Sequence, residues 1–202
     1  MFRGVLWALV LTIAGSLVAS AEDMKTRESR TVTNDTYGAT AVRPEAAEWQ
    51  IVQGGDIDKY FQQGAEVIAC FARFSTPTPD KAKDNPMILF YILPLDVGYF
   101  DKYGKKGLAK EIYKESFQKD YKDVKDLKDA ENKTYKFGKV AEFSFTGVNT
   151  KYGNPRTEVV ACLKEKRNGY MIITSGLPDM MKKYAAEVKY IMDNLKFVEP
   201  KD

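Results

Sequence analysis

The chain has 202 residues, of which 31 are Lys or Arg, 28 are Asp or Glu and none is His, and its formal net charge is +3. So small an excess, with lysines interleaved among acids, argues against nucleic acid as a partner, because that function needs basic charge concentrated on one face. Serine and cysteine nucleophiles are usually activated by an imidazole, and zinc and non-haem iron sites usually use its nitrogen. The absence of histidine therefore largely excludes these classes, and we expect no metal and no cofactor.

The N-terminus has the layout of a cleavable secretory signal. Arg3 precedes an apolar run over residues 5–18, and small residues follow at 19–21. The apolar run is shorter than the ~20 residues of a membrane span. We expect a signal peptide over residues 1–21, cleavage after Ala21, export to the periplasm or beyond the cell, and no stable membrane span afterwards; the alternative is an uncleaved anchor helix. Cleavage removes 21 of 202 residues and leaves 181, enough for one domain.

The remaining chain divides into a polar segment and a domain. Residues 22–48 are polar and small with few aliphatic side chains, which predicts a flexible leader. The folded domain is expected over residues 49–202. Period-two alternation and apolar runs bounded by Gly and Pro predict its strands. The expected strands are residues 49–53, 65–74, 87–95, 135–137, 140–148, 156–165 and 169–174.

Helical spacing appears in two longer segments and one short one. A helical turn is expected at residues 57–63, and residues 108–124 place apolar side chains on one side and Lys and Glu on the other. Residues 178–195 keep a three-and-four apolar spacing after Pro178, a residue tolerated at the first helical position. The order of elements predicts an α+β fold with a largely antiparallel β-sheet and helices on both faces.

The order of these elements resembles the Mog1/PsbP-like family from about residue 49 to residue 197. The resemblance rests on Leu93-Pro94-Leu95 before a glycine-containing connection and the helix, on Phe143-Ser144-Phe145 and Glu158-Val159-Val160 in the meander, on the strand at 169–174, and on the helix end at 191–197. It implies an α-β-α sandwich and a binding or assembly role rather than catalysis. The photosynthetic role of plant members depends on histidines among other residues, so it does not carry over to this chain.

The only two cysteines end two similar stretches, Glu66-Val67-Ile68-Ala69-Cys70 and Glu158-Val159-Val160-Ala161-Cys162. Their apolar neighbours would raise a thiol pKa, which argues against redox chemistry, and two thiolates are too few for a closed metal site. Two structural alternatives stay open. Cys70 and Cys162 form a disulfide, which requires Cα atoms within ~7 Å, or they are buried thiols on separate strands.

Carboxylates are the remaining acid–base groups, and Glu66 and Glu158 open the same two stretches. If the two strands pair, these carboxyl groups could approach each other, which raises the pKa of one of them and is the arrangement of many glycoside hydrolases. A glutamate at the start of a strand is usually solvated, however. We therefore predict no catalytic residue and keep a small exported hydrolase with this pair as the alternative.

Two loops are candidate binding features. The first carries Tyr99, Phe100 and Tyr103 among Gly, Lys and Asp, a composition that suits contact with a partner or a glycan. The second is the proline-rich loop at residues 75–86. The sequence thus predicts an exported, non-catalytic binding or assembly factor whose partner is an envelope protein or a small ligand. An envelope structural subunit is a further alternative, and the oligomeric state is open.

Overall fold

The computed structural model describes residues 30–62, 64–80, 85–96, 98, 109–165 and 167–199. The predicted signal peptide lies outside them. The described strands are β1 (Thr31–Asn34), β2 (Ala39–Val42), β3 (Trp49–Ile51), β4 (Ala69–Arg73), β5 (Ile88–Leu95), β6 (Tyr121–Lys125), β7 (Glu131–Tyr135), β8 (Gly138–Asn149), β9 (Asn154–Lys164), β10 (Gly169–Gly176) and β11 (Lys196–Phe197). The described helices are the 3₁₀ helix η1 (Gly54–Lys59) and the α-helices α3 (Ala109–Ser116), α4 (Pro178–Lys183) and α5 (Ala185–Asp193).

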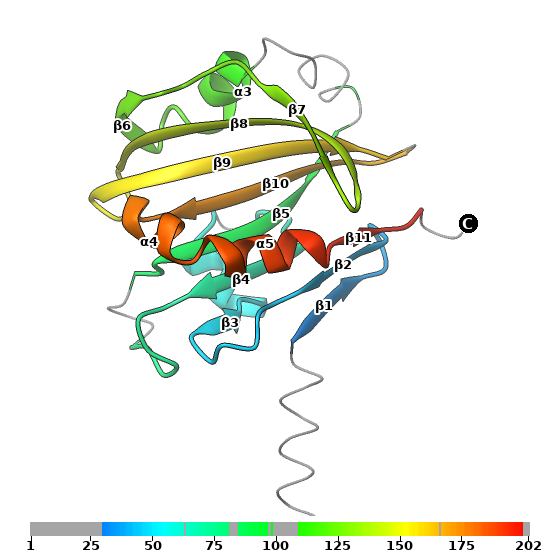
Figure 1. Cartoon of the computed structure of the whole chain (residues 1–202), viewed down its shortest axis with the longest axis horizontal. Helices are drawn as coiled ribbons and strands as arrows, with labels where there is room; N and C mark the ends of the chain where they lie inside the picture. The colour runs from blue at the N-terminus through cyan, green and yellow to red at the C-terminus, as the bar shows by residue number, and fades with distance from the viewer. Residues whose placement is uncertain are drawn as a thin grey trace, which may run out of the picture.

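An eight-stranded sheet forms the centre of the molecule, in the order β3-β4-β5-β10-β9-β8-β6, with β7 paired to the other half of β8 (Figure 1). Every pairing between its described strands is antiparallel. All residues of β10 are buried. A strand covered on both faces needs apolar side chains at successive positions, which explains the unbroken apolar run from Tyr170 to Ile173.

The two faces of this sheet have separate apolar cores. On one face, Phe90 and Ile172 pack with Ile191 of α5, which crosses in front of β5 and β4 in Figure 1. We call this the α5 face. On the other face, Val160 and Ile173 pack with Ala109 and Ile112 of α3, and we call it the α3 face. The predicted α+β class, a largely antiparallel sheet with helices on both faces, is confirmed.

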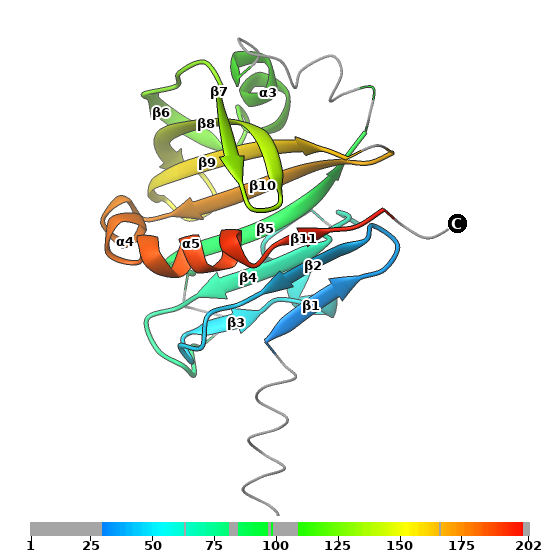
Figure 2. The same cartoon turned by 45° about the vertical axis from the view of Figure 1, so that its right-hand side comes forward.

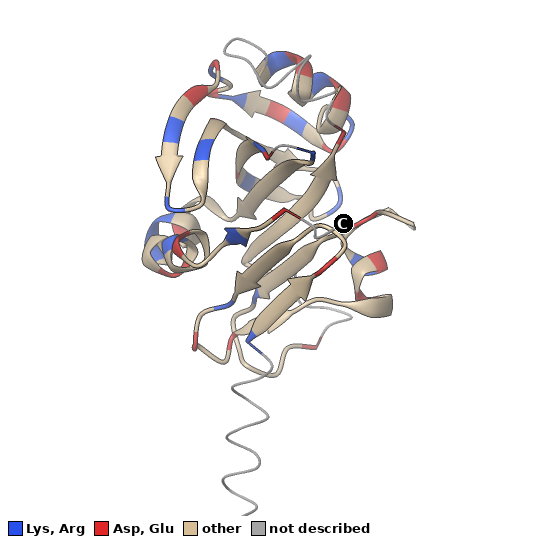
Figure 3. Cartoon of the chain, turned by 90° about the vertical axis from the view of Figure 1, so that its right-hand side faces the viewer, with Lys and Arg blue, Asp and Glu red and all other residues tan. Residues whose placement is uncertain are grey.

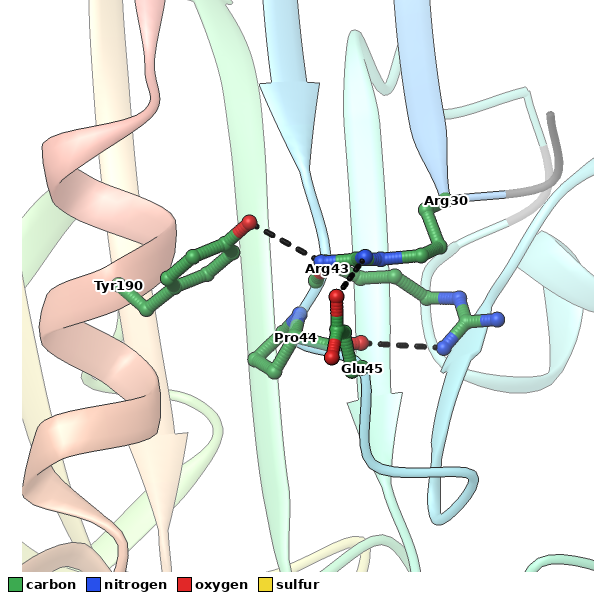
Figure 4. Close-up of polar contacts among 5 residues, drawn as sticks. All are labelled: Arg30, Arg43, Pro44, Glu45 and Tyr190. Carbon is green, nitrogen blue, oxygen red and sulfur yellow. Dashed lines mark hydrogen bonds and ion pairs between the residues drawn. The ribbon is translucent and has the colours of Figure 1, made fainter. Parts of the chain in front are cut away.

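The segment predicted as a flexible leader is folded over its described part. There β1 pairs with β2, and β2 also pairs with β11 in a three-stranded sheet beside α5 (Figure 2). Ala39 and Ala41 are buried on the α5 face. Arg30 donates to the Tyr190 hydroxyl of α5 at 3.0 Å and pairs with Glu45 at 2.6 Å (Figure 4). Short alanine side chains carry little hydrophobic signal, so composition alone misplaced the start of the domain.

Two predicted helices are shorter than expected. The helix predicted at residues 108–124 is helical only as far as Ser116, where α3 ends, and its last residues from Tyr121 onward belong to strand β6. Asp123 and Asp126 have left-handed backbone angles, φ 51° and 58°, and the pairing of β6 with β8 shifts register between Lys122 and Lys125. The alternating Lys and Asp of this segment therefore belong to a bulged edge strand.

The predicted helix at 178–195 is divided at Tyr184 into α4 and α5. The centre of the Tyr184 ring lies 3.4 Å from the guanidinium carbon of Arg73. The Nε of Arg73 forms an ion pair with the carboxylate of Glu187 on α5 at 2.9 Å. Glu187 also accepts a hydrogen bond from the Trp49 indole at 2.6 Å. Glu187 thus joins α5 to β3 and β4.

Charge is concentrated on the helices and edges of the fold. In Figure 3, Lys and Arg alternate with Asp and Glu along the helices, while the inner strands carry few charges. Within the part of the chain that the structure describes, no helix has both the length and the apolarity needed to cross a membrane.

Candidate functional site

A cavity of about 820 Å³ opens on the α3 face. Its floor comes from β5, β10 and β9, one wall from the chain around Tyr60 and Phe61 after η1, and the other from Phe117 to Tyr121 between α3 and β6. The volume lies within the range of small-molecule sites.

Glu158 lies on the cavity floor in the middle of β9. Its residue is only 1% exposed, and its neighbours across the sheet are Ser175 on β10 and Phe145 on β8. The Tyr91 hydroxyl donates to one carboxyl oxygen at 3.3 Å, and the Tyr121 hydroxyl donates to the other. The Tyr121 hydroxyl also lies 3.2 Å from the Ser175 hydroxyl. A buried carboxyl group is thus held by hydroxyl groups from three other strands.

Burial raises the pKa of Glu158 to about 7. The hydroxyls of Tyr121, Ser175 and Tyr91 and the charge of Arg156 act in the opposite direction, because they stabilise the carboxylate. Burial, together with the charge of Glu158, raises the pKa values of Tyr121 and Tyr91. Both tyrosines therefore stay protonated and remain donors, whereas Glu158 changes its charge near neutral pH.

Tyr152 and Lys151 reach the cavity from the hairpin turn between β8 and β9. The Asn149 side-chain oxygen accepts from the backbone N–H of Lys151 at 3.0 Å and of Tyr152 at 3.1 Å, and Gly153 completes the turn at φ +69°. Such a turn fixes the backbone that carries both side chains. Burial lowers the pKa of Lys151.

Behind Tyr152 lies Arg156, which is fully buried. Its guanidinium carbon is 4.2 Å from the Tyr152 ring centre, and its Nη2 donates to the Pro86 carbonyl at 2.5 Å. Nε and Nη1 of Arg156 and the Tyr152 hydroxyl have no hydrogen-bond partner among the described residues. Burial lowers the pKa of Arg156. Arg156 does not line the cavity, so its charge acts on the cavity from behind Tyr152.

The structure does not bring Glu66 and Glu158 together as a carboxylate pair. Glu66 is exposed, precedes β4 and lines the cavity rim, whereas Glu158 belongs to β9. Across β10 and β5, Glu158 is in register with Ala72 of β4, six residues beyond Glu66. The two glutamates are therefore three strand spacings apart, roughly 14 Å, and are separated by a further six residues along the strand direction. Glycosidase carboxyl pairs lie about 5–10 Å apart. The hydrolase alternative therefore loses the pair on which it depended.

Cys70 and Cys162 are free and buried. Cys70 pairs with Tyr91 across β4 and β5, and Cys162 pairs with Met171 across β9 and β10. Their strands are also three spacings apart, roughly 14 Å against the ~7 Å limit for a disulfide. Of the two alternatives, the structure shows buried thiols. Burial raises the pKa of Cys162 to about 12 and also raises that of Cys70.

The two loops predicted as binding features differ in how much of them the structure describes. Tyr99, Phe100 and Tyr103 lie outside the described residues. The described parts of the loop at 75–86 do not line the cavity. Among described residues, no three Cys, Asp or Glu side chains are grouped so that they could hold a metal ion.

The tyrosine cluster around Glu158 was not predicted. The sequence contains one signal for it. Arg156 and Glu158 occupy alternate positions of an otherwise apolar strand, on the same side as Val160 and Cys162, which pack in the core of the α3 face. Charged residues on the buried side of a strand indicate a polar site inside the core. Their partners come from β5, β6 and β10, which sequence spacing does not connect.

Comparisons with known proteins bear on the fold. No family model matches the chain, and no curated protein matches it. Cyanobacterial PsbP (CyanoP) from Synechocystis matches with a TM-score of 0.52 at 10% identity, over 83% of this chain and 91% of that one. LpqN, described as involved in cell envelope biogenesis of Mycobacterium tuberculosis, matches with a TM-score of 0.47 at 12% identity, over 79% of this chain and 84% of that one.

A protein of Bacteroides thetaiotaomicron matches with a TM-score of 0.45 at 13% identity, over 83% of this chain but 47% of its own. At 10% identity the match to CyanoP bears on the fold and not on activity. The match to CyanoP agrees with the resemblance seen in the order of the sequence elements: the chain has a PsbP-like, Mog1/PsbP-type fold.

Proposed function

We propose that the protein is an exported, non-catalytic binding protein whose cavity on the α3 face holds a small organic molecule. The observation that carries the proposal is the 820 Å³ cavity with the buried Glu158 carboxyl group on its floor. A polar group inside an apolar, aromatic cavity orients a ligand and gives specificity. The N-terminal pattern of charge, apolar run and small residues supports export.

A non-catalytic role is supported by the surroundings of Glu158. Both of its oxygens accept hydrogen bonds from tyrosine hydroxyls, and Glu66, the carboxyl group that could have acted with it, is distant. Acid–base catalysis of glycoside hydrolysis uses two carboxyl groups on opposite sides of the reacting bond. Glu158, with both oxygens already bonded to tyrosine hydroxyls, suits recognition of a ligand better than hydrolysis.

Filling the cavity tests the proposal. Ala65 lines the cavity and is exposed, so Ala65→Trp places an indole at the entrance without disturbing the core. Ala186 is an exposed alanine on α5 outside the cavity, and Ala186→Trp is the matched control. A library of aromatic compounds of drug-fragment size is screened by saturation-transfer NMR on the three proteins. We expect compounds that bind the wild type and the control but not the Ala65 variant. A screen in which no compound loses binding in that variant contradicts the proposal.

A further inference from the structure

The charges on the cavity wall are mainly negative. Among the described lining residues, four carry carboxyl groups, namely Glu66, Asp96, Asp120 and Glu158, and one, Lys151, carries an amine. The other nearby cation, Arg156, is directed at the Pro86 carbonyl and the Tyr152 ring and does not line the cavity. A ligand in the cavity therefore meets more negative than positive charge among the described lining residues.

Aromatic rings surround the carboxyl group on the floor. Phe61, Tyr91, Tyr121 and Tyr152 all line the cavity. Phe61 packs edge-to-face on Tyr91 with ring centres 4.9 Å apart, and Tyr121 packs edge-to-face on Phe145 at 5.0 Å. These contacts fix the rings before any ligand arrives. The faces of aromatic rings attract cations, and cages of such rings bind alkylammonium groups.

We infer that the cavity binds an organic cation, a protonated or quaternary amine on an apolar body, whose charged group lies against Glu158 and the surrounding tyrosine rings. The inference rests on the proposed function, because it names the class of ligand for the same cavity. A buried carboxylate is costly without a counter-charge, and a ligand cation supplies it. A neutral polyol would also hydrogen-bond to the carboxyl group but would not supply a positive charge to compensate the negative charge of Glu158.

The inference predicts pH-dependent binding. Glu158 ionises near pH 7, and it faces Tyr91 of β5, Tyr121 of β6, Ser175 of β10 and, behind Tyr152, the cationic Arg156. The tyrosines stay protonated over the same range, so Glu158 is the group that titrates. If only the ionised form binds a cation, the competent fraction falls roughly 30-fold between pH 8 and pH 5.5.

Three probes that share one body test the inference: 3-phenylpropylamine, 3-phenyl-1-propanol and 3-phenylpropanoate. Calorimetric titration of the wild type at pH 8 should show tighter binding of the amine than of the alcohol or the acid. At pH 5.5 the affinity for the amine should be roughly 30-fold lower than at pH 8, although the amine keeps its charge. Ala65→Trp should abolish amine binding.

Glu158→Gln should weaken amine binding at pH 8 and remove its pH dependence. Glu131→Gln is the control, since Glu131 is an exposed β7 residue that does not line the cavity and the change alters net charge equally. Equal or tighter binding of the alcohol or the acid overturns the cation inference and leaves the cavity as a binding site. Failure of all three probes to bind also overturns it, whereas the proposed function is decided separately by the library screen with Ala65→Trp. Because the wild-type pH profile needs no variant, a misfolded Glu158→Gln would not prevent the test.

Discussion

Glu158 makes folding stability depend on pH, and Glu158→Gln isolates that dependence. Glutamine has nearly the shape of the protonated acid, with one acceptor oxygen and a donor group, but it does not titrate. In the folded protein the pKa of Glu158 is raised from 4.5 to about 7 by burial. Below pH 4.5 the group is protonated in both the folded and the unfolded chain, so the difference between its two pKa values does not change the free energy of unfolding there.

Between pH 4.5 and 7 the unfolded chain releases this proton while the folded protein keeps it. The free energy of unfolding therefore falls as the pH rises, and above pH 7 the loss is complete. At about 1.4 kcal/mol per pKa unit, the wild type should lose about 3 kcal/mol over this range, whereas Glu158→Gln should not. Titration of all other groups cancels when the two proteins are compared at each pH.

The assay is urea denaturation followed by tryptophan fluorescence at pH 4.5, 6 and 8. The stability of Glu158→Gln relative to the wild type should rise by about 3 kcal/mol from the lowest to the highest pH. A relative stability that does not change with pH would refute the reasoning. A relative stability that falls with rising pH would show that the hydroxyl groups stabilise the carboxylate more than burial destabilises it. Tyr121→Phe removes one of these donors and should move the pH range of the effect upward.

Further predictions concern the packing and the thiols. Glu187→Ala leaves the Trp49 indole N–H and the Arg73 Nε without their acceptor, so it should lower the free energy of unfolding by about 1–3 kcal/mol in urea denaturation. Gly169→Ala should lower the free energy of unfolding by about 1–3 kcal/mol in the same assay, because a Cβ there would lie 2.7 Å from a backbone oxygen of β5. Gly55→Ala is the control: its Cβ would meet nothing within 4 Å, so the free energy of unfolding should hardly change. Cys70 and Cys162 should resist iodoacetamide in the native protein at pH 8, and after denaturation without reductant both should gain an alkyl group by mass spectrometry; an unmodified denatured chain would instead indicate a disulfide.

The sequence was most informative where local pattern and burial agree. The apolar runs at β5, β9 and β10 and the turn at Asn168-Gly169 placed the inner strands to within a few residues. It was least informative where pairing partners decide the structure. The segment from Tyr121 to Lys125 has a charge pattern that suits a helix, yet it pairs with the second half of β8 because α3 ends at Ser116.

The site could be predicted only in part for the same reason. Glu158 was recognisable as a charged residue in an apolar strand, but its chemistry depends on Tyr91 and Tyr121, which lie 67 and 37 residues away in the chain. Each of these tyrosines is unremarkable in its own segment. The sheet order places their strands around β9, and no spacing rule in one sequence contains that order.

The two similar stretches ending in cysteine show how pairing decides the role of a residue. In the first, β4 begins only at Ala69, and the neighbours Ile68 and Ala69 both pack into the core of the α5 face. The strand alternation is therefore interrupted, and Glu66 stays exposed at the cavity rim. In the second stretch, β9 is already paired on both sides from residue 157 onward, so alternation holds and turns Glu158 into the core. Nearly the same five residues thus give an exposed glutamate in one strand context and a titrating buried acid in the other, and the difference comes from the extent of the neighbouring strands.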